Sequence, residues 1–271
     1  MGSYNIKNIL KDFYYKPQIP LIKMKFKLLK KKKVLVIGSG PSCELKNYIL
    51  KDYVVICCNG SASVLKENNQ NITPYLTIID NELIDHTIAY EKDVRNVIIK
   101  NKLLKNLNLG NLISVQSNHS KNRNPNILEA NFKSFTYINK NFRRALLNNL
   151  LNTNFIENDN DSLVSTGIFS ICLSFLFGAS EVEFTGFSLW NNEQYYSFNT
   201  NFVRKITSSA APPPSPTTAT SKNETISLKE LTRNHSLADS LCIALLKVKK
   251  FKVHTKDKDF LPLMTNWGTI E

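Results

Sequence analysis

The chain alternates short apolar runs with longer stretches in which apolar residues recur at helical spacing. The apolar runs predict strands over Val34–Ile37, Val54–Cys58, Leu76–Ile79, Val94–Ile99, Leu112–Val115, Glu181–Thr185 and Phe251–His254. The periodic stretches predict helices over Cys43–Leu50, Ser63–Asn68, Phe142–Leu151, Thr166–Phe177 and Ala238–Leu246. Apolar strands that alternate with helices indicate an α/β fold with a doubly wound, mainly parallel, Rossmann-like sheet.

A glycine-rich loop, GSGPS at residues 38–42, follows the first predicted strand. Ligands of doubly wound sheets bind beyond the carboxyl ends of the strands, where this loop lies. Its glycines let the backbone approach a ligand, and free amides at the start of the next segment favour phosphate. A tight turn with a purely structural role is the alternative. The dinucleotide fingerprint places a third glycine where this chain has Cys43 and an acidic residue where it has Asn59, which disfavours NAD.

Further along the chain, three segments carry candidate chemistry. Ser165-Thr166-Gly167 opens the most apolar predicted helix, either as its cap or as the wall of a ligand pocket. The loop at residues 186–199 places aromatic side chains among amides, which suits base or sugar stacking; its aromatics could also simply anchor the loop. His235 precedes a helix and is the best placed of the four histidines for a general base.

The cysteines and the acidic residues give little sign of a metal site. The five cysteines, Cys43, Cys57, Cys58, Cys172 and Cys242, form no CxxC pair, so we expect free thiols in a reducing compartment. Asp159 and Asp161 form a DxD string of the kind that metal-dependent glycosyltransferases use, but no predicted strand precedes it. We expect no bound metal.

Bulk composition is typical of a globular protein, with 42% hydrophobic and 21% charged residues in 271. No uncharged apolar run reaches 18 residues and no signal peptide is evident, so we expect a cytoplasmic protein. Residues 207–221 read TSSAAPPPSPTTATS, a composition that indicates a flexible or extended linker.

The net charge of +13 is concentrated at the start of the chain, where residues 1–33 contain ten lysines and one aspartate. Aromatic and aliphatic residues are interleaved with these lysines. Such a leader suits anionic lipid headgroups, and a solvated tail is the equal alternative. No zinc-finger spacing or RNA-binding signature accompanies the charge, so a nucleic-acid partner is not expected.

Taken in order, these motifs resemble the bacterial sialyltransferases of glycosyltransferase family 42. The resemblance runs from about Lys33 to Leu263 and rests on VLVIGSGPS, CCNG, IIDNELI, VSTGIFSICLSFLFGASEVEFTGFSLW, YYSFNT and a His-Ser before the closing helix. It implies a GT-A-type variant of the fold with a small mobile lid. The expected organisation is a leader (1–33), a nucleotide-binding core (34–190), a lid (191–234) and a C-terminal part of the core (235–271).

The resemblance also implies residue roles. It places the CMP donor against Gly38, Ser39, Gly40, Ser42, Asn59, Asp80, Asn81, Ser165, Thr166, Gly167 and Tyr195. Tyr196 would hydrogen-bond the departing phosphate, and His235 would be the base. Trp190 stands where the family has another phosphate-binding tyrosine, and Ser39 where many members have asparagine.

The implied reaction is the inverting transfer of sialic acid from CMP-sialic acid to a hydroxyl group, without a cofactor or an essential metal. The expected acceptor is a galactose-terminated, lipid-linked glycan of lipooligosaccharide or capsule biosynthesis, and the expected place is the inner face of the cytoplasmic membrane. A homo-oligomer is implied as well. Transfer of Kdo, legionaminic or pseudaminic acid, and a non-catalytic nucleotide-binding role, remain alternatives.

Overall fold

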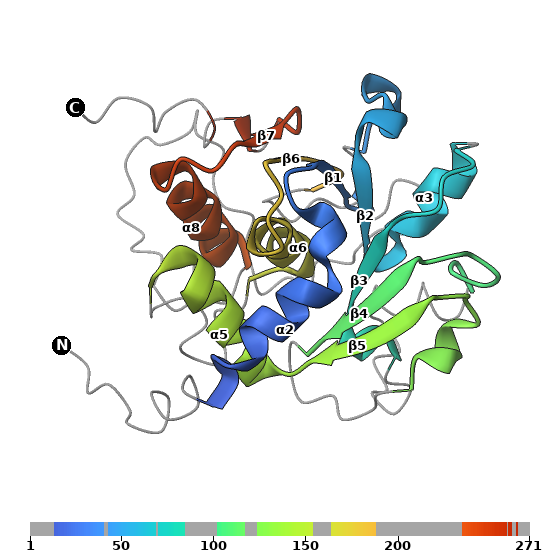
Figure 1. Cartoon of the computed structure of the whole chain (residues 1–271). Coiled ribbons are helices and arrows are strands. Elements are labelled where there is room, and N and C mark those ends of the chain that lie inside the picture. Colours follow the sequence, from blue (N-terminus) through green and yellow to red (C-terminus); the bar gives the residue numbers. More distant parts are fainter. Residues whose placement is uncertain are drawn as a thin grey trace, which may run out of the picture.

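The computed structural model describes residues 14–40, 43–68, 70–84, 102–116, 124–153, 164–187, 235–258, 260–261 and 264, without the side chains of residues 82–83 and 235–237. These residues form a seven-stranded sheet with helices against both faces (Figure 1). No helix among them is long and apolar enough to cross a membrane.

All strand pairs in the sheet are parallel. The strands are β1 (Lys33–Ile37), β2 (Val54–Cys58), β3 (Leu76–Asp80), β4 (Asn111–Val115), β5 (Ser134–Ile138), β6 (Glu181–Thr185) and β7 (Val253–Thr255). Their order is β5-β4-β3-β2-β1-β6-β7. This topology confirms the predicted doubly wound α/β fold, and the order reverses between β1 and β6, which is the switch point where such sheets bind ligands.

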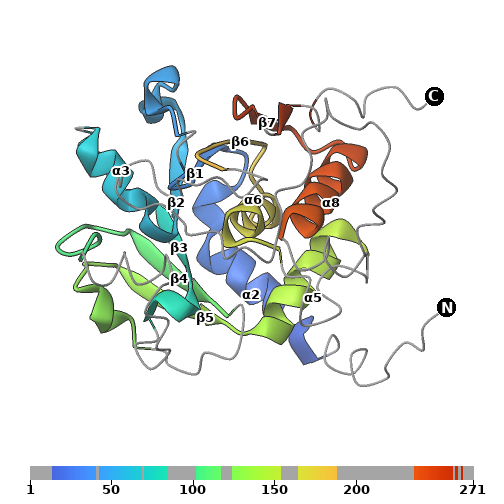
Figure 2. The same ribbon diagram turned by 180° about the vertical axis from the view of Figure 1, so that it is seen from behind.

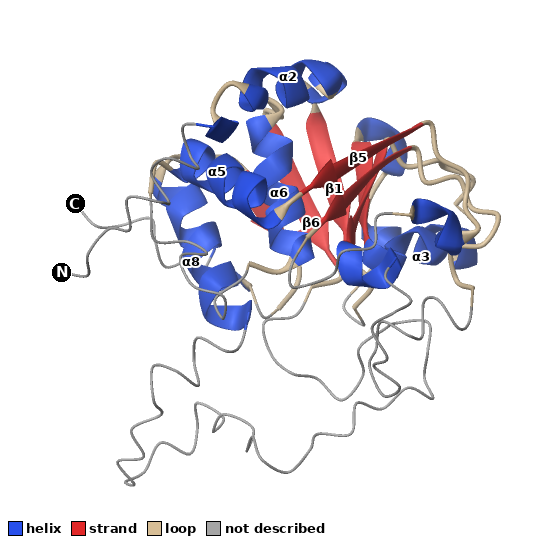
Figure 3. Cartoon of the chain, turned by 90° about the horizontal axis from the view of Figure 1, so that it is seen from below, coloured by secondary structure: helices blue, strands red, loops and turns tan. Residues whose placement is uncertain are grey.

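Two hydrophobic clusters lie on opposite faces of the sheet. Along β1, Val34 and Val36 belong to one cluster while Leu35 and Ile37 belong to the other, as the two-residue period of a strand requires. The first face is covered by α2 (Gln18–Lys25), α5 (Lys140–Leu151), α6 (Thr166–Leu176) and α8 (His235–Val248). The second is covered by α3 (Ala62–Glu67) and by short 3₁₀ turns (Figures 2 and 3).

One prediction of secondary structure was wrong, and one strand was not predicted. The helix expected over residues 43–50 is a pair of 3₁₀ turns, η2 (Leu45–Asn47) and η3 (Leu50–Asp52), which bury Leu45 and Leu50 but leave Ile49 exposed; Leu45 and Leu50 are five positions apart, a spacing that does not share one face of an α-helix. Strand β5 was missed because this edge strand is only half-buried over most of its length and carries polar Ser134 and Thr136. The strand expected over 94–99 lies outside the described residues.

From Tyr14 onward, the expected leader packs onto the α/β core. Ile19, Ile22, Phe26 and Leu29 are buried in the cluster beneath α5 and α6, and the Phe26 ring stacks on Phe177 with centroids 4.9 Å apart. The Nζ atom of Lys25 donates to Thr136 Oγ1 in β5 at 2.6 Å. This part of the leader is therefore a structural element of the sheet's helix layer, and contact with a membrane stays a prediction.

Candidate functional site

The glycine-rich loop after β1 lies alongside the end of β6. The amide of Gly38 donates to the Thr185 carbonyl oxygen at 2.8 Å, and the amide of Gly40 donates to the Gly186 carbonyl oxygen at 2.9 Å. A Cβ atom on Gly38 would overlap the Gly186 carbonyl group, and one on Gly40 would lie 2.7 Å from its oxygen. The two backbones therefore meet too closely for a side chain. Neither of these two glycine amides is therefore a free hydrogen-bond donor for a phosphate, and the amides of residues 41–42 lie outside the described residues.

Ser39, between the two glycines, is buried, and Ser42 lies outside the described residues. Gly38 and Gly40 thus have a structural role in packing against Gly186. A direct role in donor binding stays a prediction for both serines.

The start of α6 approaches the same edge of the sheet. Ser165 caps the helix, because its Oγ accepts from the Ile168 amide at 3.3 Å. A Cβ atom on Gly167 would overlap the ring of Phe187, the second residue after β6. The Thr166 and Gly167 amides have no acceptor among the described residues. The cap is confirmed, and two donors remain at the positive end of the helix.

The residues after β2 and β3 are joined to each other. Asn59 adopts a left-handed conformation with φ 52°, which asparagine tolerates better than most residues. Its Oδ1 accepts from the Asp80 amide at 2.9 Å, which leaves Asn59 Nδ2 without an acceptor among the described residues. Asn81 is fully buried and its Oδ1 accepts from Ser114 Oγ at 2.9 Å. Asp80 and Asn81 are both candidates for binding the CMP donor, and of these two residues Asp80 is the one that reaches the surface.

Helix α8 is tied to the cap of α6 by a buried carboxylate. Asp239, only 5% exposed, accepts a hydrogen bond from the Ser165 amide through Oδ1 at 2.7 Å. Helix α8 begins at His235, one turn before Asp239. The backbone of the candidate base is therefore close to the start of α6. Its side chain lies outside the described residues, as do Trp190, Tyr195, Tyr196, Asp159, Asp161 and the segment 207–221.

Asp257, which the sequence reasoning did not single out, organises the end of β6. It is 3% exposed; its Oδ1 accepts from Thr185 Oγ1 at 3.1 Å and its Oδ2 accepts from the Phe187 amide at 2.8 Å. These bonds hold the Gly186 turn, which has φ 83°, against the glycine-rich loop. Asp257 follows the last strand, so the strand-end rule that pointed to Asn59 could also have found it.

The cysteines at this edge are neutral thiols. Burial and the nearby Asp257 carboxylate raise the pKa of Cys43 to about 12. Burial likewise raises the pKa of Cys58 to about 12, although Ser170 opposes the shift by hydrogen bonding. Neither side chain is a thiolate nucleophile at neutral pH. Among the described residues, no three His, Cys, Asp or Glu side chains are grouped to hold a metal ion.

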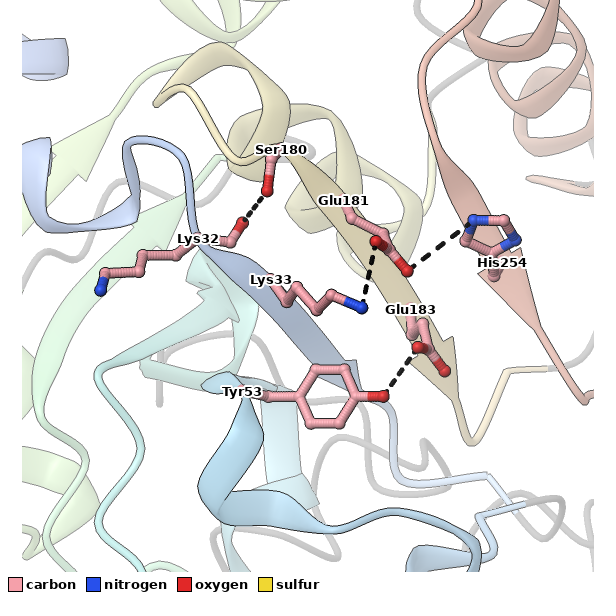
Figure 4. A network of polar contacts seen from close by, with 7 residues as sticks. All are labelled: Lys32, Lys33, Tyr53, Ser180, Glu181, Glu183 and His254. Atoms are coloured by element: carbon pink, nitrogen blue, oxygen red, sulfur yellow. Dashed lines mark hydrogen bonds and ion pairs between the residues drawn. The ribbon is translucent and has the colours of Figure 1, made fainter.

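His254 belongs to a separate polar network across β1, β6 and β7 (Figure 4). Its Nε2 lies 4.0 Å from Glu181 Oε1, and Lys33 Nζ lies 3.4 Å from the other oxygen of that carboxylate. Beside them, Tyr53 Oη donates to Glu183 at 2.7 Å. Burial and this hydrogen bond raise the pKa of Tyr53 to about 12. His254 pairs with Glu183 in the middle of β6, away from the carboxyl edge of the sheet.

The predicted site residues that are described therefore gather at one edge of the sheet. The loops after β1, β2, β3 and β6 end there, together with the start of α6. What this edge offers chemically is the partly exposed Asp80 carboxylate beside neutral hydrogen-bond donors, namely the Asn59 amide group and the first amides of α6. Such groups suit the polar parts of a nucleotide and its phosphate.

Comparisons with known proteins give solved structures only. No family model matches the chain, and no curated protein matches it. The chain is similar to the Campylobacter jejuni sialyltransferase CstII in complex with a trisaccharide acceptor and CMP, with 18% identity, a TM-score of 0.43, and coverage of 83% of this chain and 80% of that one. It is also similar to the monofunctional α-2,3-sialyltransferase Cst-I from Campylobacter jejuni, with 15% identity, a TM-score of 0.45, and coverage of 85% and 78%. The fold class stated above rests on this chain's own strand pairing.

Proposed function

We propose that the protein is an inverting glycosyltransferase that moves sialic acid from CMP-sialic acid to a hydroxyl group of a glycan. The proposal is carried by one observation: motifs that are far apart in sequence and resemble those of sialyltransferases in family 42 meet at one edge of the sheet. Asn59 after β2 and Gly167 at the start of α6 are 108 positions apart, yet both belong to this edge.

In this proposal the donor lies across the ends of β1, β2 and β3. Asn59 Nδ2 and Asp80 hold the polar groups of the nucleotide, and the Thr166 and Gly167 amides bind its phosphate. The hydrogen-bonding groups on these residues are fixed before the ligand arrives, because the Asn59–Asp80 and Ser165–Asp239 hydrogen bonds hold them in place. Preorganised donors stabilise the negative charge that develops on a departing phosphate.

Transfer needs a base for the acceptor hydroxyl group and donors for the leaving group. We assign the base to His235, which must be neutral to accept the proton. Tyr196 and Trp190 donate hydrogen bonds to the phosphate as its bond to the sugar breaks. CMP is a good leaving group, so orientation and charge stabilisation are sufficient and no divalent ion takes part.

The finer parts of the proposal concern the acceptor and its place. We propose a galactose-terminated, lipid-linked glycan as acceptor, a protein that works at a membrane surface, and a homo-oligomeric assembly. Kdo, legionaminic and pseudaminic acid are the alternative sugars. A non-catalytic nucleotide-binding protein is the alternative function, and the occupied amides of Gly38 and Gly40 favour it because they reduce the donors available to a phosphate.

The test combines a substrate panel with two histidine variants. The protein is incubated with CMP-Neu5Ac or CMP-Kdo and a set of galactosides, and CMP release and glycan mass are followed with and without EDTA. We expect transfer that survives EDTA. His235→Ala should abolish transfer and keep CMP binding, whereas His254→Ala, remote from the carboxyl edge, should keep both.

Each contrary result has a defined meaning. CMP binding without transfer from either donor would favour the non-catalytic function. Full transfer by His235→Ala would show that His235 is not the base. A loss of transfer in EDTA that Mg²⁺ restores would indicate a metal site at Asp159 and Asp161.

A further inference from the structure

Helix α2 and the turn after it carry apolar side chains on two opposite sides. On the inner side, Ile22 and Phe26 are buried in the core. On the outer side, Leu21 is 63% exposed, Met24 is 67% exposed, and Leu28 in the following 3₁₀ turn is 55% exposed. Leu21 and Met24 are three residues apart and therefore share one face of the helix. After α2 has packed onto the sheet, a second apolar face remains outside.

This outer face is a cluster rather than a scatter of surface residues. Single exposed apolar side chains are ordinary on soluble proteins. Among the described residues, however, four of the eight large hydrophobic side chains that are exposed lie between Tyr14 and Leu28. Half of the exposed large hydrophobic side chains of the described residues thus belong to one short segment, and a local concentration of exposed apolar side chains is typical of an interaction site.

The charge around the cluster has one sign. Residues 14–33 contain eight lysines and no aspartate or glutamate. Lys25 is bound to Thr136, and Lys33 pairs with Glu181. No described carboxylate pairs with the exposed lysines of the turn, which are Lys27, Lys30, Lys31 and Lys32. A partner must therefore offer negative charge at its surface and an apolar layer for the leucines and the methionine.

We propose that this outer face, formed by Leu21, Met24, Leu28 and the neighbouring lysines, docks the protein on a bilayer that contains anionic lipids. Interfacial helices bind in this way: their apolar side chains enter the boundary between headgroups and acyl chains, while neighbouring lysines contact anionic headgroups. A second copy of the chain would bring the same lysines against these lysines, which disfavours self-association through this face.

The surface is fixed in position before it meets a membrane. Phe26 stacks on Phe177, and Lys25 reaches the edge strand β5. The neighbouring Tyr15 stacks on Phe142 with centroids 5.4 Å apart. The helix therefore does not have to fold on binding, and its outer side chains can be exchanged without removing a core contact.

The test uses the full chain and vesicles of defined composition. Sedimentation with phosphatidylcholine vesicles is compared with sedimentation with vesicles in which about a third of the lipid is phosphatidylserine, at low and at physiological salt. We expect binding to the anionic vesicles that weakens with salt. The triple variant Leu21→Ser, Met24→Ser, Leu28→Ser should reduce the partition coefficient at least about tenfold, by loss of apolar burial.

A matched control exchanges exposed apolar side chains elsewhere. Leu241 and Val248 on α8 are 40% and 63% exposed, so Leu241→Ser with Val248→Ser should leave vesicle binding unchanged. Equal melting temperatures would show that all variants fold. Wild-type protein that stays in solution with anionic vesicles, or a triple variant that binds as wild type does, overturns the proposal. So does a loss of oligomers in the triple variant without a lipid effect, which would assign the face to a second copy. Because no sugar donor is used, failure here is separate from failure of the proposed transfer.

Discussion

Replacing Asp239 with alanine tests whether the link between α8 and α6 organises the proposed site. The variant removes the acceptor of the Ser165 amide, a 2.7 Å bond to a carboxylate that is 5% exposed. A hydrogen bond to a charged group contributes about 1.5–3 kcal/mol, and the orphaned amide adds its own desolvation cost. We expect the free energy of unfolding to fall by about 2–3 kcal/mol.

Urea unfolding followed by circular dichroism measures this change. Asp239→Asn keeps an oxygen acceptor in the same place, so we expect a loss below about 1.5 kcal/mol. Asp52→Ala removes an exposed carboxylate and should change the value by less than about 0.5 kcal/mol. An unchanged urea midpoint for Asp239→Ala would refute the reasoning about stability.

Transfer kinetics then separate positioning from stability. Asp239→Ala, assayed where it is fully folded, should lower kcat more than it weakens CMP binding, because loss of the hydrogen bond to the Ser165 amide loosens the start of α8 and therefore His235. A variant that is destabilised as expected but transfers at the wild-type rate would show that this link does not position the base.

Three further predictions concern other parts of the molecule. Gly40→Ala places a Cβ 2.7 Å from the Gly186 oxygen and should destabilise the fold by about 1–3 kcal/mol in urea unfolding; an unchanged midpoint would mean that the loop yields easily. Phe26→Ala should cost about 3–5 kcal/mol whereas exposed Met24→Ala should cost less than about 0.5 kcal/mol, and equal values would contradict the packing of α2. Two lysines hold the pKa of Glu129 at about 2, below its ordinary 4.5, so its contribution to stability is present above pH 4.5 and is lost as the pH falls towards 2. Glu129→Gln should reduce the dependence of the melting temperature on pH over that range. A pH profile identical to that of the wild type would contradict this prediction.

The sequence predicted most of the sheet because its central strands are buried on both faces. Short continuous apolar runs such as VLVI and VVICC are typical of strands that are buried on both faces. Strand β5 lacks this signal, since Ser134 and Thr136 interrupt it at the edge of the sheet. The role of α2 was hidden by its lysines, which dominate the composition although every third or fourth residue faces the core.

The position of the site at the ends of the strands could be predicted from the sequence, but the hydrogen bonds and close backbone contacts within it could not. Asn59 and Asp80 were found because each follows an apolar run, and the sheet does bring them together. Gly38 was interpreted as a ligand-facing glycine, while the need for it comes from Gly186, 148 positions away. Asp239 and Asp257 have no local pattern, because their partners are backbone amides that only the tertiary structure supplies.

Strand β1 links the proposed docking face to the proposed site. Helix α2 enters β1 at its amino end through a short turn, whereas the Gly38–Gly40 loop leaves at its carboxyl end. Five residues of parallel strand span about 16 Å at about 3.3 Å each. An enzyme resting on α2 would hold its donor at about this height above the lipid headgroups. If both proposals hold and β1 stands upright on the bilayer, the strand would act as a spacer that favours sugars at the outer tip of a glycan over those next to its lipid.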